Sequence, residues 1–283
     1  MKIRRSDRLI DMTNFLLDHP RELVALPFFV KRYGSAKSSI SEDLVIIKRA
    51  FKAQGLGVVR TLPGAAGGVE YLPGISEPLA RDFLELMAEK MADSNRLLPG
   101  GYLYLSDLLG TPNYLKIIGR LIAAQYSEEK VDAVMTVATK GIPIAQSTAN
   151  YLGVPFVVAR RDPKITEGAT VSVNYVSGSS DRVQKMELSK RSLSDGANVV
   201  IVDDFMKGGG TIHGMHDLIK EFNAHLVGIT VFAETAFSGK RAVQDYTSLL
   251  EVTEINTQTD QILVQPGNYL EKLQLMTTAE NTD

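Results

Sequence analysis

The segment VVIVDDFMKGGGTIHGM, residues 199–215, contains the feature that most narrows the fold of this chain. Four apolar residues run into the carboxylates Asp203 and Asp204, and a loop with three glycines then leads into a helix-like stretch. A short apolar run bounded by a glycine loop is typical of a strand buried on both faces of a sheet. The succession of strand, loop and helix therefore indicates an α/β fold with a mostly parallel sheet.

The same alternation of strand and helix extends over much of the C-terminal part of the chain. Strands rich in Val and Ile are expected over residues 131–138, 154–160, 198–204 and 226–234. Helices are expected between them, over residues 111–127, 143–153 and 212–223. Such a sheet carries helices on both faces, and its ligands bind at the carboxyl ends of the strands.

The N-terminal residues follow a different pattern. Amphipathic spacing predicts helices over 7–17, 26–34 and 35–55, with Ser35 as the N-cap of the third helix. Two short strands then flank PGAAGG, residues 63–68, which has the composition of a hairpin tip. Three helices followed by a two-stranded hairpin predict a winged-helix DNA-binding domain.

The charge distribution agrees with a nucleic-acid module at the N-terminus. Residues 1–74 carry 12 Lys and Arg against 7 Asp and Glu, a net charge of +5, whereas the remainder has 19 basic and 26 acidic residues. A basic segment on an acidic body is the charge footprint of a DNA-binding domain attached to another domain.

The third helix begins with small polar residues, which can reach base edges and phosphates from a recognition helix. The run AKSSISEDL also resembles the third helix of many bacterial winged-helix regulators. Basic residues on either side are expected to contact phosphates. A small helical bundle that only forms a dimer contact is the alternative. The residues expected at the DNA are Lys2, Arg4, Arg5, Lys37, Ser38, Ser39, Ser41 and Arg60.

Several protein classes are excluded by composition. The chain has no cysteine, which removes disulfides and thiolate chemistry and fits a reducing cytoplasm. It has no apolar run of the roughly 18 residues needed to span a membrane, and the N-terminus does not read as a secretory signal. We therefore expect a cytoplasmic protein without a membrane partner. The expected divisions are a winged helix over 1–74, a helical connector over 75–100, an effector domain over 101–270 and a tail over 271–283.

Two loops of the effector domain are suited to anions. In TVATKGIPIA, Thr139, Lys140 and Gly141 join a strand to a helix start, where exposed N–H groups and a lysine suit a diphosphate. The glycine loop after Asp203 and Asp204 suits a terminal monophosphate, and the two carboxylates suit the hydroxyls of a ribose. Neither a P-loop nor a dinucleotide fingerprint is present. Together the two anion sites and the diol site predict phosphoribosyl diphosphate (PRPP) as the ligand.

The segment 159–193 lies between two expected sheet strands and is unusually long for such a connection. It begins with Arg160 and Arg161 and contains two strand-like runs around a turn. A lid over the ligand and a β-arm used in dimerisation are the two interpretations of this segment.

The run VVIVDDFMKGGGT resembles the PRPP motif of type I phosphoribosyltransferases, most closely the adenine and xanthine salvage enzymes. The resemblance covers roughly residues 100–255. With a winged helix in front, the chain resembles the purine operon regulators of Gram-positive bacteria. The resemblance implies a homodimer that reads symmetric double-stranded DNA operators, and PRPP accompanied by Mg²⁺ as effector.

The resemblance also implies a role for each site residue. Asp203 and Asp204 would hold the ribose, and Thr139, Lys140 and Gly141 the diphosphate, assisted by Arg160 or Arg161. Phe205 and Tyr102 are candidate contacts for a purine base. The PRPP-contacting segment is expected to run on through Phe205, Met206, Lys207, Gly208, Gly209, Gly210 and Thr211.

Lys207 favours a sensor over an enzyme. Some purine-using phosphoribosyltransferases have an acidic residue at this position, whereas a lysine opposes charge development on a reacting purine and strengthens phosphate binding. We therefore expect a non-catalytic repressor, or an activator, of purine biosynthesis genes, with purine nucleotides or guanosine alarmones as competitors for the pocket. The alternatives are an active purine phosphoribosyltransferase that also binds nucleic acid, and an interaction protein without a ligand.

Overall fold

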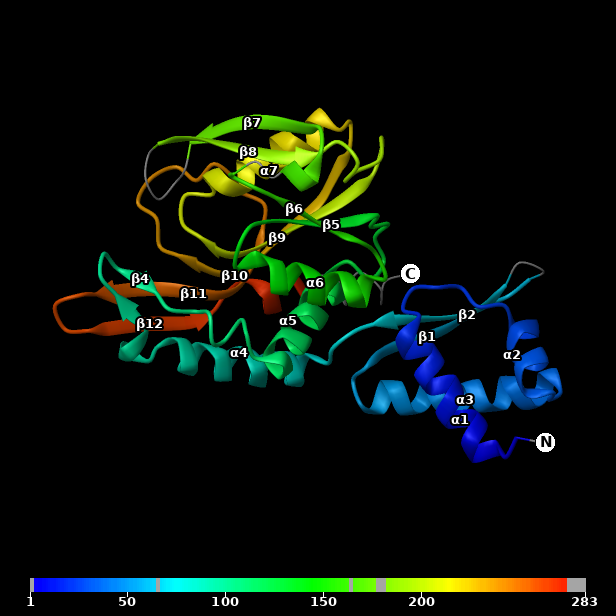
Figure 1. Cartoon of the computed structure of the whole chain (residues 1–283). Coiled ribbons are helices and arrows are strands. Elements are labelled where there is room, and N and C mark those ends of the chain that lie inside the picture. The colour runs from blue at the N-terminus through cyan, green and yellow to red at the C-terminus, as the bar shows by residue number, and fades with distance from the viewer. Residues whose placement is uncertain (1–2, 65–66, 163–164, 177–181, 274–283) are drawn as a thin grey trace.

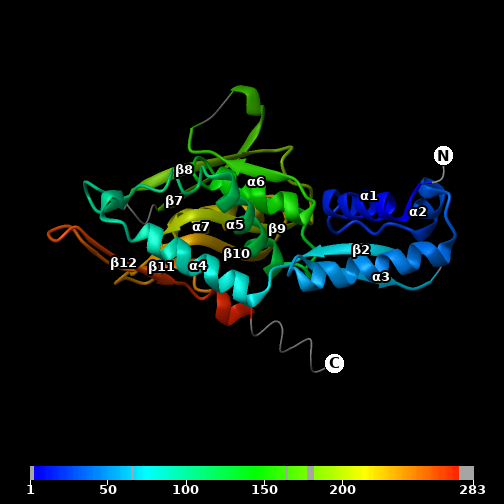
Figure 2. The same ribbon diagram turned by 90° about the horizontal axis from the view of Figure 1, so that it is seen from below.

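The computed structural model describes residues 3–64, 67–162, 165–176 and 182–273 of the 283-residue chain. These residues form an N-terminal domain of three helices and a hairpin, followed by a larger α/β domain (Figure 1). The smaller domain lies at one end of the larger one in two perpendicular views (Figures 1 and 2). Both predicted fold classes are confirmed. No helix in these residues has the length and apolar character needed to cross a membrane.

The N-terminal domain consists of α1 (Arg5–Asp18), α2 (Leu26–Tyr33) and α3 (Lys37–Ala53), followed by an antiparallel pair of strands, β1 (Gly57–Leu62) and β2 (Gly68–Pro73). Pro27 lies in the first turn of α2, and Gly34 ends this helix in the left-handed region at φ = 58°, where glycine is favoured. The domain has its own core, which includes Met12, Leu16, Phe29, Ile40, Ile47, Phe51 and Tyr71.

The prediction of Ser35 as the N-cap of α3 is wrong. Ala36 precedes the helix and provides no side-chain cap. The Ser35 hydroxyl instead accepts a hydrogen bond of 3.0 Å from Arg8 Nη1 and donates one of 3.3 Å to the carbonyl of Tyr33. Arg8 is buried, and its guanidinium needs acceptors there, so the hydroxyl is used by α1 rather than by α3.

The larger domain is built on a six-stranded sheet in the order β12-β11-β10-β9-β5-β6. All neighbours are parallel except β11 and β12, so the antiparallel pair closes one edge. The strands are β5 (Ala133–Val137), β6 (Phe156–Ala159), β9 (Asn198–Met206), β10 (His225–Thr235), β11 (Thr247–Asn256) and β12 (Gln261–Pro266).

Helices cover one face of the sheet more completely than the other. Apolar side chains of α4 (Glu77–Met91), α5 (Pro112–Gln125) and α6 (Gly141–Leu152) share the main core with β9, β10 and β11. The expected connector, residues 75–100, thus supplies α4 to this core. It also includes the 3₁₀ turn η1 (Ser94–Arg96) and β3 (Leu97–Leu98), which pairs with β4 (Tyr102–Leu103).

The opposite face carries α7 (Gly210–Glu221) and the arm that follows β6. The arm contains the 3₁₀ turn η2 (Ile165–Glu167) and the antiparallel strands β7 (Thr170–Val176) and β8 (Val183–Ser189), which lie over α7 in Figure 1. Tyr175 of the arm is 4% exposed, and an added Cβ on Gly214 of α7 would lie 2.9 Å from its ring. The two arm strands therefore form a layer of the domain, packed on the helix that follows the glycine loop.

Arginine side chains join the two domains at the start and end of the hairpin. Arg120 of α5 donates from Nε to the carbonyl of Gly74 at 2.6 Å, and its Nη2 donates to the carbonyl of Gly55. In the reverse direction, Arg21 Nη1 donates to the carbonyl of Tyr126 at 2.6 Å. Backbone carbonyls on both sides of the hairpin and at the end of α5 are thus held by charged donors.

Candidate ligand site and nucleic-acid interface

The paired carboxylates lie in the second half of β9, between β5 and β10 in the sheet. Asp203 is 3% exposed, and its Oδ1 accepts a hydrogen bond of 3.0 Å from the backbone N–H of Asp204. Burial raises the pKa of both carboxyl groups, and the charge of Asp204 raises the pKa of Asp203 further. Donors or cations placed beside the pair would favour its ionised form.

The predicted diphosphate loop lies directly against these acids. It follows β5, with Lys140 at the N-cap of α6 and Gly141 as its first residue. A Cβ on Gly141 would lie 3.1 Å from Asp203 Oδ1 and would overlap the hydroxyl of Thr136, so the close approach requires glycine. The positive charge of Lys140 opposes the raising effect of burial on the pKa of Asp204. The helix start and the acids thus form one site.

The Thr136 hydroxyl is a member of this site that the sequence did not single out. In the described part of the chain it is fully buried and has no hydrogen-bond partner. Its position under Gly141 places an unused polar group beneath the expected diphosphate. The only sequence signal was a single Thr within an apolar strand.

The glycine loop leads into α7 as predicted. Gly209 is the N-cap with φ = 78°, a conformation that side chains rarely adopt, and Gly210 begins the helix. Lys207 is exposed, whereas Gly208 and Gly209 are buried. The loop therefore presents backbone N–H groups at a helix N-terminus, which is the geometry that binds a phosphate.

The other predicted ligand contacts have different environments. Phe205 is half-buried and packs against the main core, while Met206 is 2% exposed in the core beneath α7, so Met206 offers only its backbone to a ligand. Tyr102 belongs to the β3–β4 hairpin and is 62% exposed. Base contacts by Phe205 and Tyr102 stay a prediction.

The two arginines after β6 differ in what they contact. The Arg160 backbone exchanges hydrogen bonds of 2.9 and 2.8 Å with Glu187, and its Nε donates to Glu167 at 3.2 Å. Arg161 is exposed, and its positive charge opposes the raised pKa of Asp203. Arg160 therefore holds the base of the arm, whereas the charge of the exposed Arg161 acts on Asp203.

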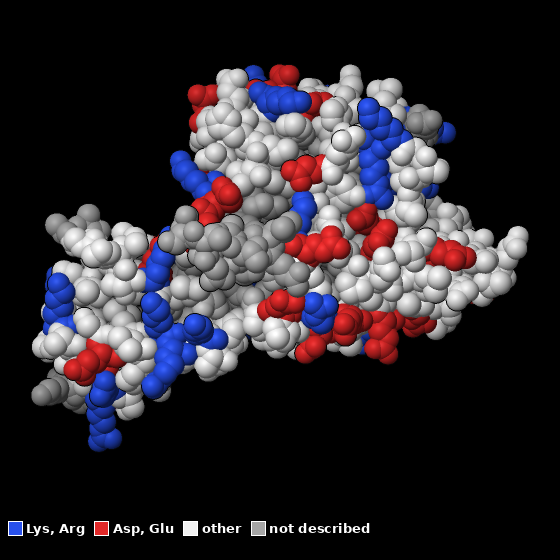
Figure 3. All heavy atoms as spheres, turned by 180° about the vertical axis from the view of Figure 1, so that it is seen from behind, with Lys and Arg blue, Asp and Glu red and all other residues white. Residues whose placement is uncertain are grey.

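The first turns of α3 present most of the predicted polar side chains to solvent. Lys37, Ser38 and Ser41 are exposed, and Ser39 is half-buried. Lys and Arg side chains gather on the small domain at the left of Figure 3, and acidic side chains gather along the lower edge of the larger domain. The same helix exposes four further residues that the sequence prediction did not include, although their helical spacing from Ser38 and Ser41 was a usable signal: Val45, Lys48, Arg49 and Lys52.

The basic residues predicted to contact phosphates on either side of α3 are less available for DNA than expected. Arg4 is exposed just before α1, and Lys2 lies outside the described residues. Arg5 donates from Nε to the buried carboxylate of Asp43 at 2.9 Å. Arg60 pairs with Glu70 at 2.8 Å and, across the domain junction, with Glu128 at 2.9 Å. Phosphate contacts by Arg5 and Arg60 would compete with these internal ion pairs.

Comparison with known proteins agrees with this two-domain organisation. Residues 4–73 match the family described as "Bacterial purine repressor, N-terminal", and residues 105–269 match the family "Phosphoribosyl transferase domain". An adenine phosphoribosyltransferase structure from Thermoanaerobacter pseudethanolicus has a TM-score of 0.52 at 23% identity, covering 59% of this chain and 99% of that one. This likeness shows the fold alone.

Two relatives share almost the whole chain. The purine biosynthesis transcriptional repressor PurR of Bacillus subtilis (strain 168) is 54% identical over 270 residues, 95% of each chain. The purine biosynthesis transcriptional activator PurR of Lactococcus lactis subsp. lactis (strain IL1403) is 56% identical over 266 residues, 94% of this chain and 98% of that one. The chain therefore belongs to the PurR family of purine biosynthesis regulators of Gram-positive bacteria.

Proposed function

We propose that this protein is a DNA-binding regulator of purine biosynthesis genes that senses PRPP in a non-catalytic phosphoribosyltransferase-like site. The observation that carries the proposal is the convergence of two helix N-termini, at Gly141 and Gly210, on the strand that holds Asp203 and Asp204. Two anion sites beside a pair of carboxylates match a ribose with a phosphate at one end and a diphosphate at the other.

Each part of the ligand has a matching group. The hydroxyls of the ribose donate to Asp203 and Asp204, and the 5-phosphate lies on the N–H groups of residues 208–211. The diphosphate lies on residues 139–141, with Arg161 assisting. Two carboxylates and the ligand's own phosphates also form the oxygen donor set that Mg²⁺ prefers, so the ion would bind together with PRPP.

The exposed ammonium of Lys207 favours sensing over catalysis. It stands at the start of the glycine loop, where its positive charge attracts a phosphate but opposes positive charge on a reacting purine. The α3 helix of a DNA-binding domain on the same chain gives the bound ligand a readout that a salvage enzyme does not need.

The ligand would act by binding one DNA-affinity state better than another. The two relatives are a repressor and an activator, so the same parts support either sign of control. We further propose a cytoplasmic homodimer that reads a symmetric operator with paired α3 helices. Purine nucleotides and guanosine alarmones would compete with PRPP, because both combine a ribose with phosphates.

A pair of measurements tests the sensor. Isothermal titration of Mg·PRPP into the wild type is expected to give saturable binding, which Asp203→Ala/Asp204→Ala abolishes. Incubation of the wild type with PRPP and adenine, guanine, hypoxanthine or xanthine is expected to release no pyrophosphate above background. Turnover that depends on Asp203 and Asp204 would instead make the protein an active phosphoribosyltransferase.

A further inference from the structure

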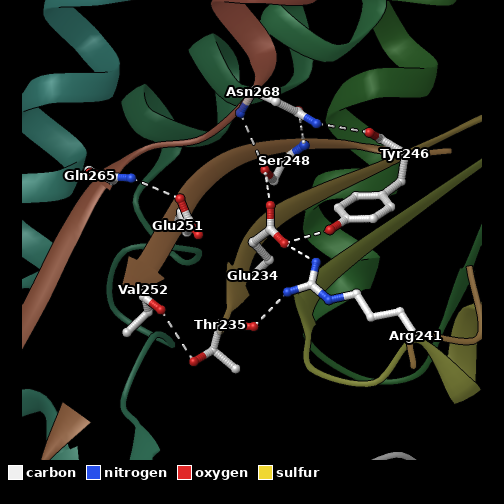
Figure 4. A network of polar contacts seen from close by, with 9 residues as sticks. All are labelled: Glu234, Thr235, Arg241, Tyr246, Ser248, Glu251, Val252, Gln265 and Asn268. Atoms are coloured by element: carbon white, nitrogen blue, oxygen red, sulfur yellow. Dashed lines mark hydrogen bonds and ion pairs between the residues drawn. The ribbon is translucent and has the colours of Figure 1, made fainter. Parts of the chain in front are cut away.

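The carboxylate of Glu234 lies at the centre of a polar network (Figure 4). Glu234 stands near the end of β10 and is 7% exposed. Its Oε2 accepts a hydrogen bond of 2.6 Å from the Tyr246 hydroxyl and is paired with the Arg241 guanidinium. Its Oε1 accepts a hydrogen bond of 2.5 Å from the Ser248 hydroxyl. All three donors follow β10 in the chain, so one carboxylate holds the segment 241–248 against the end of β10.

Arg241 is the cation of the network and is paired with Glu234. Besides the ion pair, its Nη2 donates to the carbonyl of Thr235 at 2.8 Å, and its guanidinium carbon lies 5.5 Å from the centre of the Tyr246 ring. These contacts all lie at one end of β10, as Figure 4 shows. The guanidinium is mostly buried, so the charge of Glu234 is its principal compensation.

The two residues that follow Arg241 hold the glycine loop directly. The backbone N–H of Ala242 donates to the carbonyl of Gly208 at 2.9 Å. Val243 packs against Gly209, where an added Cβ would lie 2.8 Å from Val243 Cγ2. The conformation of the glycine loop is thus set by a segment whose anchor is Arg241.

We propose that Glu234 is a positioning residue for the 5-phosphate subsite. It holds Arg241, and thereby keeps Ala242 and Val243 against the glycine loop, so that the N–H groups of the loop are aligned before the ligand binds. The inference rests on the proposed sensing function and deepens it by assigning the network to the monophosphate end of the ligand. A loop already in its binding conformation loses less affinity to ordering.

The test uses the full-length protein and two ligand fragments. Ribose 5-phosphate probes the glycine loop, and Mg·pyrophosphate probes the loop at residues 139–141. In Glu234→Gln the charge-assisted bond to Arg241 is lost, and calorimetric titration is expected to show affinity for ribose 5-phosphate falling about tenfold. The affinity for pyrophosphate is expected to be unchanged, which a general loss of folding would not produce.

Glu251→Gln is the matched control. Glu251 lies opposite Glu234 on the neighbouring strand, and its carboxylate accepts a hydrogen bond of 2.8 Å from Gln265 rather than from the segment after β10 (Figure 4). Both affinities are expected to equal those of the wild type. Tyr246→Phe, which removes a single donor, is expected to show a smaller loss for ribose 5-phosphate alone and serves if Glu234→Gln does not fold.

Three results would overturn the proposal. Wild-type affinity of Glu234→Gln and Tyr246→Phe for ribose 5-phosphate would show that the network does not position the loop. An equal loss for both ligands would show a general structural role. Wild-type protein that binds neither fragment nor Mg·PRPP would remove the sensing function itself, and the inference with it.

Discussion

At the scale of single residues, the chemistry of this protein centres on two carboxyl groups that share one buried site. Burial and mutual repulsion raise the pKa of Asp203, and burial raises that of Asp204. The nearby charges of Lys140 and Arg161 offset only part of this effect. We therefore expect ligand binding and proton release to be coupled at this pair.

We predict that ribose 5-phosphate releases a proton from the pair when it binds. Its hydroxyls donate to ionised carboxylates, so affinity rises with pH from about 4, the ordinary pKa of aspartate, up to the raised value. Calorimetry in buffers with different heats of ionisation measures the release. The phosphate of the ligand contributes equally to every variant, so Asp203→Asn is expected to release fewer protons than the wild type. Equal release by both proteins would contradict the shared-site account.

The raised pKa of Asp203 also determines how the stability of the ligand-free protein changes with pH. The folded state holds more protons than the unfolded state between the ordinary and the raised pKa. The free energy of unfolding is therefore expected to fall as the pH rises through that window, and less steeply in Asp203→Asn. Urea titrations at several pH values measure the slope.

The sequence was sufficient to identify the acids and the glycine loop, because strand, acid and glycine signals are local. It could not separate Arg160 from Arg161, since that choice depends on how Glu167 and Glu187 of the arm fold back on Arg160. Arg5 and Arg60 were predicted to contact phosphates, because their carboxylate partners are distant in sequence and could not be identified from it.

At the scale of elements, the predicted recognition helix α3 depends on a buried ion pair. Asp43 of α3 is fully buried and accepts hydrogen bonds of 2.9 Å from Arg5 and 2.5 Å from Arg8, both on α1. A carboxylate at the centre of two guanidinium groups ties the angle of α3 to that of α1. The orientation of the face of α3 that is predicted to contact DNA is thus set by α1.

We predict that Asp43→Asn lowers the free energy of unfolding by about 3 kcal/mol, because it leaves a buried arginine without its counter-charge. Operator affinity is expected to fall as well. The control is Glu42→Gln on the same helix, whose carboxylate is 70% exposed and pairs with Arg5 at 3.5 Å. Such an exposed pair contributes at most about 1 kcal/mol. Urea unfolding measures the free energy of unfolding, and fluorescence anisotropy measures operator affinity. Similar losses in the two variants would contradict the assigned role of Asp43.

The expected α/β alternation identified β5, β6, β9, β10 and the helices between them, but not β11 and β12. Residues 247–256 include exposed polar positions, and their place in the sheet comes from pairing with β10 rather than from a local pattern. Likewise α4 was visible as an amphipathic helix, but its partner surface on β11 and β12 was not.

At the scale of the whole molecule, the two domains meet through charged donors on backbone carbonyls. Arg21 reaches the carbonyls after α5, and Arg120 reaches those at Gly55 and Gly74, on either side of the hairpin. These contacts give the DNA-binding domain a defined orientation on the effector domain. Any ligand-driven movement of α5 would be passed to the hairpin.

We predict that Arg21→Ala/Arg120→Ala uncouples the domains. Calorimetric unfolding is expected to show one transition for the wild type and two for the double variant, because each domain has its own core. Arg81→Ala serves as control, since Arg81 is exposed on α4 and pairs with Glu77 one turn away. A single unchanged transition in the double variant would mean that other contacts hold the domains together.

We predict that ligand bound at the phosphoribosyltransferase-like site controls DNA affinity, which a single titration can measure. Full-length protein is bound to a fluorescent purine-operon promoter fragment, and anisotropy is followed as Mg·PRPP is added. We predict that PRPP changes the DNA affinity by about fivefold or more, in line with typical coupling energies, and that Asp203→Ala/Asp204→Ala binds the fragment without responding to PRPP. A wild-type affinity for DNA that is indifferent to PRPP would contradict the account.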